Sequence, residues 1–176
     1  MRAFMTLTGL MALLTLAAPA AAQITKAPAA KTKQAIKVET VASGLVHPWG
    51  LAFLPDGRLL VTERPGRMRI VGKDGKLSAP VQGVPKVFAS GQGGLLDVVA
   101  APDFAGSRLI YFSYAEPREG GKNGTAVARA QLAADGSRLD QFEVIFHQEP
   151  SYNSSNHFGS RIVFARDGSL FVTLGD

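Results

Sequence analysis

Short apolar runs, separated by glycine-containing turns, dominate the chain from about residue 36 onward. Ten of these runs have the length and the branched or aromatic content that β-strands favour. They cover residues 38–42, 51–53, 58–63, 67–71, 95–100, 109–114, 126–132, 142–146, 161–164 and 169–173. No segment of this part shows a sustained apolar period of 3.6 residues, so the pattern predicts an all-β fold.

Dipeptides that favour tight turns lie between the predicted strands. Their glycines can adopt the positive φ that hairpin turns require. These pairs are Asp56-Gly57, Pro65-Gly66, Asp74-Gly75, Gly120-Gly121, Asp135-Gly136 and Asp167-Gly168. The strands are therefore predicted to be joined as hairpins.

One part of the pattern is repeated. Residues 51–62 and 162–173 share a phenylalanine, an Asp-Gly pair and a Val-Thr pair in one register, and residues 98–112 form a third copy with a longer turn. The aspartates of the three copies are 47 and 64 residues apart. The shorter spacing is typical of a four-stranded propeller blade of ~40–50 residues. The longer spacing predicts a blade with an inserted loop, at residues 116–124.

At one blade per ~40–50 residues, residues 37–176 are predicted to form a partial β-propeller of about three blades. Closed propellers have ~4–8 blades. Either the chain is an incomplete gene product or several copies associate. An open array would expose unpaired strand edges. We therefore interpret the chain as an N-terminal fragment.

The first 36 residues have a different character. A positive start, an apolar run over residues 3–18 and small residues before Gln23 predict a signal peptide over residues 1–22. A membrane anchor is the alternative, but the run is shorter than the ~20 residues that span a bilayer. The basic, alanine-rich residues 23–36 are interpreted as a flexible tether. We expect periplasmic localisation, with no stable membrane insertion after signal cleavage.

Composition narrows the choice of partners. The chain has no cysteine, which fits a bacterial periplasm and argues against a small disulfide-stapled domain. The net charge is +5, yet the basic residues do not form runs, and no nucleic-acid recognition motif accompanies Arg64, Arg67 and Arg69. We expect no nucleic-acid partner, although a basic surface attracts anionic cofactors.

His157 is the candidate for chemistry among three histidines. It follows a polar stretch, residues 150–156, and leads directly into a predicted inner strand. Loops at such strand entrances line one mouth of a propeller channel. On this pattern alone, a structural role and a catalytic role both fit His157. His47 is interpreted as ordering a turn against Trp49, and His147 as a structural residue at a strand end.

Several motifs occur in a fixed order along the chain. They are His47-Pro-Trp-Gly-Leu-Ala-Phe, Gly91-Gln92-Gly-Gly-Leu-Leu, Pro102-Asp103-Phe104, Asn156-His157-Phe158-Gly159 with Arg161, and Leu174-Gly175-Asp176. Together, over about residues 38–176, they resemble the soluble aldose sugar dehydrogenases of the glucose/sorbosone dehydrogenase family, which use pyrroloquinoline quinone (PQQ). The resemblance implies a six-bladed β-propeller, in agreement with the repeat.

The resemblance also implies an oxidation of aldose sugars at C1 to lactones, with hydride transfer to PQQ. His157 matches the general base, and Gln92 matches a glutamine beside the substrate and the quinone. Asn156 stands where some glucose-oxidising relatives carry aspartate. Arg161 matches a basic position that either orients the loop or approaches the cofactor.

A Ca²⁺ ion is implied beside PQQ. Its ligands and most of the PQQ-binding residues are expected beyond Asp176, so no metal ligand is assigned and the chain alone is expected to be inactive. The electron acceptor is not identified. Two other classes also fit the blade repeat: a non-catalytic propeller that binds carbohydrate or protein, and a metal-dependent lactonase, which needs clustered acidic ligands.

Overall fold

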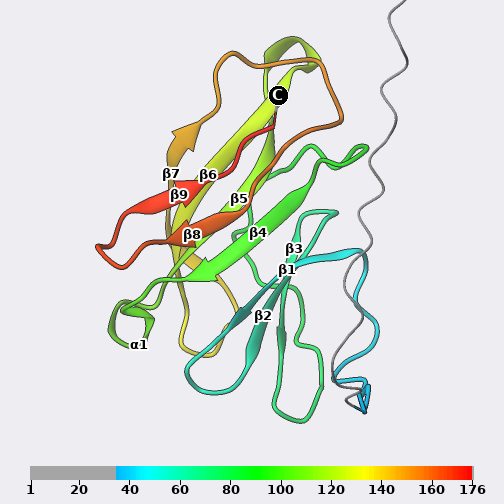
Figure 1. Cartoon of the computed structure of the whole chain (residues 1–176), viewed down its shortest axis with the longest axis vertical. Helices are drawn as coiled ribbons and strands as arrows, with labels where there is room; N and C mark the ends of the chain where they lie inside the picture. The colour runs from blue at the N-terminus through cyan, green and yellow to red at the C-terminus, as the bar shows by residue number, and fades with distance from the viewer. Residues whose placement is uncertain (1–34, 176) are drawn as a thin grey trace, which may run out of the picture. The chain divides into compact units, whose positions relative to one another are not determined.

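Nine strands form three antiparallel sheets in residues 35–175, the part of the chain that the computed structural model describes (Figure 1). The first sheet contains β1 (Pro48–Phe53), β2 (Leu59–Glu63) and β3 (Arg67–Val71). The second contains β4 (Leu95–Ala100), β5 (Leu109–Pro117), β6 (Asn123–Leu132) and β7 (Leu139–His147). The third contains β8 (Ile162–Phe164) and β9 (Leu170–Val172). In every sheet the spatial order follows the chain order.

Nine of the ten predicted strands are confirmed, and the one at residues 38–42 is wrong. Residues 38–42 lie in no sheet of the described region, and Val38 and Val41 are 89% and 64% exposed. An apolar run becomes a strand only where a neighbouring strand pairs with its backbone and a core covers its side chains. The predicted signal peptide and most of the predicted tether lie outside the described residues.

The turn glycines have the predicted conformation. All seven glycines of the six dipeptides have positive φ, from 66° at Gly120 to 104° at Gly66. The aspartates of the Asp-Gly pairs stabilise the turns as well, through their side chains. Asp56 and Asp167, for example, accept hydrogen bonds from the backbone N–H groups of Arg58 and Ser169, two residues later, at 3.0 and 2.9 Å. The repeat is therefore a repeated hairpin that opens each sheet.

The longer spacing between repeats has a different origin from the predicted inserted loop. β5 and β6 remain paired up to Pro117 and Asn123, and only the short 3-10 turn η1 (Glu119–Gly121) closes the hairpin. The additional residues lie in the nine- and ten-residue strands and in residues 148–161, which lead to β8. A one-turn helix, α1 (Phe104–Ser107), fills the longer connection between β4 and β5.

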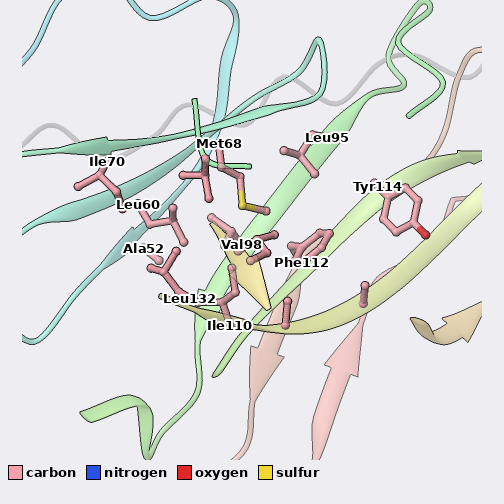
Figure 2. Close-up of a cluster of buried hydrophobic side chains, with 14 of the residues drawn as sticks. Ala52, Leu60, Met68, Ile70, Leu95, Val98, Ile110, Phe112, Tyr114 and Leu132 are labelled. Carbon is pink, nitrogen blue, oxygen red and sulfur yellow. The ribbon is translucent and has the colours of Figure 1, made fainter. Parts of the chain in front are cut away.

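The main core lies between the first and second sheets (Figure 2). Leu60 and Met68 of the first sheet are fully buried against Leu95, Ile110 and Phe112 of the second. Each such side chain contributes about 1.5–3 kcal/mol when it leaves water. This packing makes the second sheet a rigid support for whatever lies on its other face. Within residues 35–175, no helix has the length and apolar character that crossing a membrane would need.

The other face of the second sheet carries the third sheet. Its strand β8 contacts β4 and β5, and the third sheet lies in front of β5 and β6 in Figure 1. Tyr111 of β5 and Phe164 of β8 meet edge to face, with 5.1 Å between ring centroids. Towards one end this face changes from apolar to polar, because Ser113 and Thr125 are fully buried there. These hydroxyls contact the segment that contains His157.

Candidate active site

The segment from residue 148 to residue 161, which joins β7 to β8, carries Asn156 and His157. Its first half is attached to the start of β6. The backbone N–H and C=O of Asn123 pair with the C=O and N–H of Tyr152 at 2.8 and 2.9 Å, and the Asn123 side chain donates to the Ser154 carbonyl at 2.7 Å. These hydrogen bonds hold the first half of the segment in one conformation, although it forms no strand.

Buried hydroxyl groups fix the second half of the segment. Thr125 Oγ1 donates to the carbonyl of Phe158 at 2.8 Å, and Ser113 Oγ donates to the carbonyl of Ser160 at 2.7 Å. The Phe158 ring packs in a small apolar cluster with Leu96 and Ala115. The carbonyls of Phe158 and Ser160, just after His157, are therefore hydrogen-bonded, and the buried Phe158 ring fixes this part of the segment.

A buried carboxylate holds the end of the segment. Asp97, which is 1% exposed, accepts the backbone N–H of Ile162 at 2.8 Å and the guanidinium of Arg161 at 2.9 Å. The same guanidinium lies 5.5 Å from the ring centroid of Trp49. A buried charge needs such pairing to be tolerated. Arg161 thus connects β8 to β4 and to Trp49 on β1.

Gln92 and His157 are 65 residues apart in sequence and in direct contact in the structure. The backbone N–H of His157 donates to Gln92 Oε1 at 2.9 Å, and the backbone N–H of Gln92 donates to the Ser155 carbonyl at 2.7 Å. The guanidinium of Arg64 donates to the carbonyl of Gly91 and supports the Gln92 loop from the other side.

His157 has an uncommon backbone conformation, with φ of 61°. For a residue with a side chain this left-handed conformation costs on the order of 1–3 kcal/mol and persists only where the surroundings hold it. The bond to Gln92 is one such constraint. Gly175 is another, because a Cβ at this position would overlap the His157 carbonyl oxygen. Only glycine allows this approach of the two backbones.

Two hollows open beside these residues. One, of about 310 Å³, is lined by Asn156 and His157 together with Tyr152, Asn153 and Gln148. The other, of about 200 Å³, is lined by Gln92 and Trp49 among others. Phe158 lines both. Of the four predicted site residues, Asn156 and His157 thus line one hollow and Gln92 lines the other. Arg161 lines neither, but its guanidinium lies near Trp49 of the second hollow.

Sequence analysis did not identify the residues that position this site. Asp97, Ser113, Thr125 and Asn123 all act on the His157 segment through hydrogen bonds. Their common signal is a polar residue within an otherwise apolar strand, such as Asp97 in Leu-Leu-Asp-Val-Val. That signal indicates a buried polar contact but does not name the partner.

Comparison with known proteins decides which fold and family this arrangement represents. The model of the family described as Glucose / Sorbosone dehydrogenase matches residues 45–176. The chain belongs to this family. It is 50% identical over 142 residues to aldose sugar dehydrogenase YliI of Escherichia coli (strain K12), a match that covers 80% of this chain and 38% of the relative.

Solved structures agree with the family assignment. A glucose dehydrogenase crystal structure with 55% identity gives a TM-score of 0.77 over 80% of this chain and 41% of that chain. The PQQ-bound form of an aldose sugar dehydrogenase from Streptomyces coelicolor, 32% identical, gives 0.69 over 78% of this chain and 40% of that one. The propeller prediction is confirmed. The second sheet has the four strands of one blade, and the first and third sheets have three and two strands. The chain spans about two fifths of the length of these relatives.

The residues present can be tested against the two groups that the family resemblance implies. PQQ carries carboxylates and quinone carbonyls, which accept hydrogen bonds, and the Gln92 amide and the Arg161 guanidinium are donors that suit them. Calcium requires several oxygen ligands. Within residues 35–175, no group of three or more histidine, cysteine, aspartate or glutamate residues could hold a metal ion. Gln92 and Arg161 therefore fit contacts to PQQ, and no calcium ligand is assigned among the described residues.

Proposed function

We propose that this chain supplies the first blades of a periplasmic, PQQ-dependent dehydrogenase that oxidises aldose sugars at C1 to lactones. The contact between the His157 backbone and the Gln92 side chain supports this proposal most strongly. It brings the proposed base and the proposed orienting amide together in a chain that belongs to the glucose/sorbosone dehydrogenase family.

The proposed role of His157 is to accept the proton of the anomeric hydroxyl. A neutral imidazole suits this task near neutral pH, and proton transfer to a positioned side chain typically contributes 10²–10⁴-fold to a rate. The hydride and its two electrons leave C1 as the C1–O bond gains double-bond character. PQQ, when bound, supplies the electrophilic quinone carbon that accepts the hydride.

Neutral amides orient the sugar in this proposal. The side chains of Gln92 and Asn156 can each donate and accept hydrogen bonds without adding a charge beside the base. Asn156 lines the same hollow as His157, and Gln92 already accepts the His157 N–H. Because the Asn156 side chain is a neutral amide, it orients its neighbours by hydrogen bonding rather than by charge.

Arg161 has a positioning role and a second role as a contact to PQQ in this proposal. Its ion pair with Asp97 fixes the exit of the His157 segment, and its side chain is still 60% exposed. The exposed N–H groups of the guanidinium are available to a carboxylate of PQQ, since the Asp97 bond uses only Nη1.

A chimera tests the function directly. In it, this chain replaces the segment it matches in the E. coli relative, so that the remaining blades are present. Loaded with PQQ in the presence of Ca²⁺, the chimera is expected to reduce an electron-accepting dye when given glucose. With methyl glucoside, whose anomeric oxygen carries no proton, it is expected to be inactive.

Two results would contradict the proposal. One is equal turnover of glucose and methyl glucoside. The other is a folded chimera that binds PQQ and oxidises no free aldose, which would favour a non-catalytic binding propeller. The 176-residue chain alone is expected to show no turnover, because it spans only 38% of the relative.

A further inference from the structure

Arg64 lies at the turn between β2 and β3, and both its backbone and its side chain contact the loop that carries Gln92. Its carbonyl accepts the backbone N–H of Leu95 at 3.0 Å. Its guanidinium Nη1 donates to the carbonyl of Gly91 and, at 3.4 Å, to that of Gly93. The first sheet therefore holds the loop both before and after Gln92.

The loop packs directly on Arg64. Gly94 has φ of 143°, and a Cβ at this position would overlap the Arg64 carbonyl oxygen and come within 2.6 Å of Arg64 Cγ. Glycine alone combines this backbone conformation with such a close approach. The end of the loop is thereby placed against the backbone of Arg64, within reach of its side chain.

The peptide group between Gly91 and Gln92 is hydrogen-bonded at both ends. Its carbonyl accepts from the Arg64 guanidinium, and its N–H donates to the Ser155 carbonyl at 2.7 Å. Hydrogen bonds in such a row polarise one another, and a charged donor strengthens the first of them. The side chain that follows this peptide group is the one whose Oε1 accepts the His157 N–H at 2.9 Å. A continuous row of contacts therefore leads from Arg64 to the backbone of His157.

The Arg64 guanidinium differs from its neighbours in what it contacts. Arg67 and Arg69 approach the buried carboxylate of Glu63 at 2.7 and 4.0 Å. The hydrogen bonds of the Arg64 side chain go to backbone carbonyls instead. A guanidinium presents its N–H groups in one rigid plane, which suits two carbonyls of the same loop better than the flexible ammonium of lysine does. Both the partners and the geometry of Arg64 thus serve to hold the loop.

We propose that Arg64 is a positioning residue, which fixes the orientation of Gln92 and, through Gln92, the backbone of His157. The part of Gln92 and His157 in sugar oxidation rests on the proposed function. The positioning itself does not, because these contacts require neither PQQ nor substrate.

Amide hydrogen exchange in the 176-residue chain tests the positioning without the reaction. The His157 N–H is expected to exchange about tenfold faster or more in Arg64→Leu than in the unsubstituted chain, because its acceptor is no longer held. Arg108→Leu is the matched control, since Arg108 also donates to two backbone carbonyls, those of Leu132 and Ala133, at 3.1 and 2.8 Å. Equal exchange at His157 in the two variants overturns the proposal. If Arg64→Leu does not fold, Arg64→Lys and Arg108→Lys take the place of the leucine variants, with the same expectation.

A double-mutant cycle in the PQQ-loaded chimera measures how this positioning acts on the reaction. Arg64→Leu is expected to lower kcat for glucose by about tenfold or more, but by less than about twofold when Gln92→Ala is already present. Arg64→Lys is expected to give an intermediate kcat, because it keeps the charge without the planar group.

The two experiments separate failure of this inference from failure of the proposed function. If Arg64→Leu lowers kcat equally with and without Gln92→Ala, Arg64 does not act through Gln92 and only the positioning role is wrong. If the chimera oxidises no aldose, the proposed function is wrong, and the exchange of the His157 N–H still decides the positioning role.

Discussion

At the scale of single residues, the backbone of His157 is held tightly in an uncommon conformation. Its positive φ is held by two constraints, the bond to Gln92 and the close approach of Gly175. Strained conformations of this kind are retained where the surrounding structure over-determines them, which is common at functional sites. Gln92 is the constraint most easily removed without disturbing the fold.

Gln92→Ala should therefore weaken catalysis more than stability. Loss of the acceptor for the His157 N–H should lower kcat of the chimera by about tenfold or more, while the free energy of unfolding falls by only about 1 kcal/mol. Gln92→Glu keeps an oxygen acceptor and should restore part of kcat. Steady-state kinetics and urea denaturation measure the two effects. A kcat for Gln92→Ala equal to that of the unsubstituted chimera would contradict this role.

Glu116 gives a prediction for pH. Burial alone would raise the pKa of Glu116, but hydrogen bonds from His147 at 2.8 Å and Arg118 at 3.0 Å hold the pKa below its ordinary value of 4.5. A carboxyl with a depressed pKa in the folded state stabilises above its ordinary pKa, and this stabilisation is lost as pH falls through the folded-state value.

The wild-type chain should therefore be more stable than Glu116→Gln at pH 7, and the difference should shrink as pH falls below about 4.5. Urea denaturation of both proteins between pH 7 and pH 3 measures this difference. If it stays constant over the whole range, the charge of Glu116 does not contribute.

At the scale of elements, three adjacent strands of the second blade hold one connecting segment. Asp97 on β4, Ser113 on β5 and Thr125 on β6 each bond to the backbone between Phe158 and Ile162. The same sheet is fixed on its opposite face by the main core. The precision of the site thus comes from a rigid sheet that carries a short buried polar row.

Thr125→Val tests this row with almost no change in side-chain volume. The Phe158 carbonyl would lose its donor in a buried place, which should cost about 1–3 kcal/mol of unfolding free energy. Hydrogen exchange should increase around residues 156–160, and Thr125→Ser should retain wild-type behaviour because it keeps the hydroxyl. Equal exchange in the valine and serine variants would show that the hydroxyl does not hold the segment.

At the scale of the whole molecule, the fold was largely predictable because it is a repeated hairpin. The Asp-Gly turns have a local physical cause, and the predicted register of the copies is confirmed. The failed strand at residues 38–42 shows the limit of such patterns. A run of residues specifies its own preference but not whether a partner strand is present.

The candidate site was only partly predictable for a related reason. Gln92, Asn156, His157 and Arg161 were identified from motif resemblance, whereas Asp97 and the buried hydroxyls act through contacts between distant segments. Those contacts depend on which faces of the sheets meet, and sequence spacing does not specify that.

Exposed apolar side chains mark where the described blades would meet others. Phe53 and Leu51 on β1 are 78% and 47% exposed, and Phe171 and Val163 on the third sheet are 63% and 53% exposed. Contiguous apolar surfaces of this kind usually serve as contact sites. In the chimera these faces would be covered, which is why it is the suitable form for kinetic tests.

The account depends most on His157 as the base, and one measurement tests this directly. In the PQQ-loaded chimera, kcat for glucose is compared between His157→Ala and His147→Ala, whose imidazole lies on β7 beside Glu116. The account predicts that His157→Ala lowers kcat by about 10²–10⁴-fold with PQQ binding retained, whereas His147→Ala changes it little. A kcat for His157→Ala close to that of the unsubstituted chimera would contradict the account.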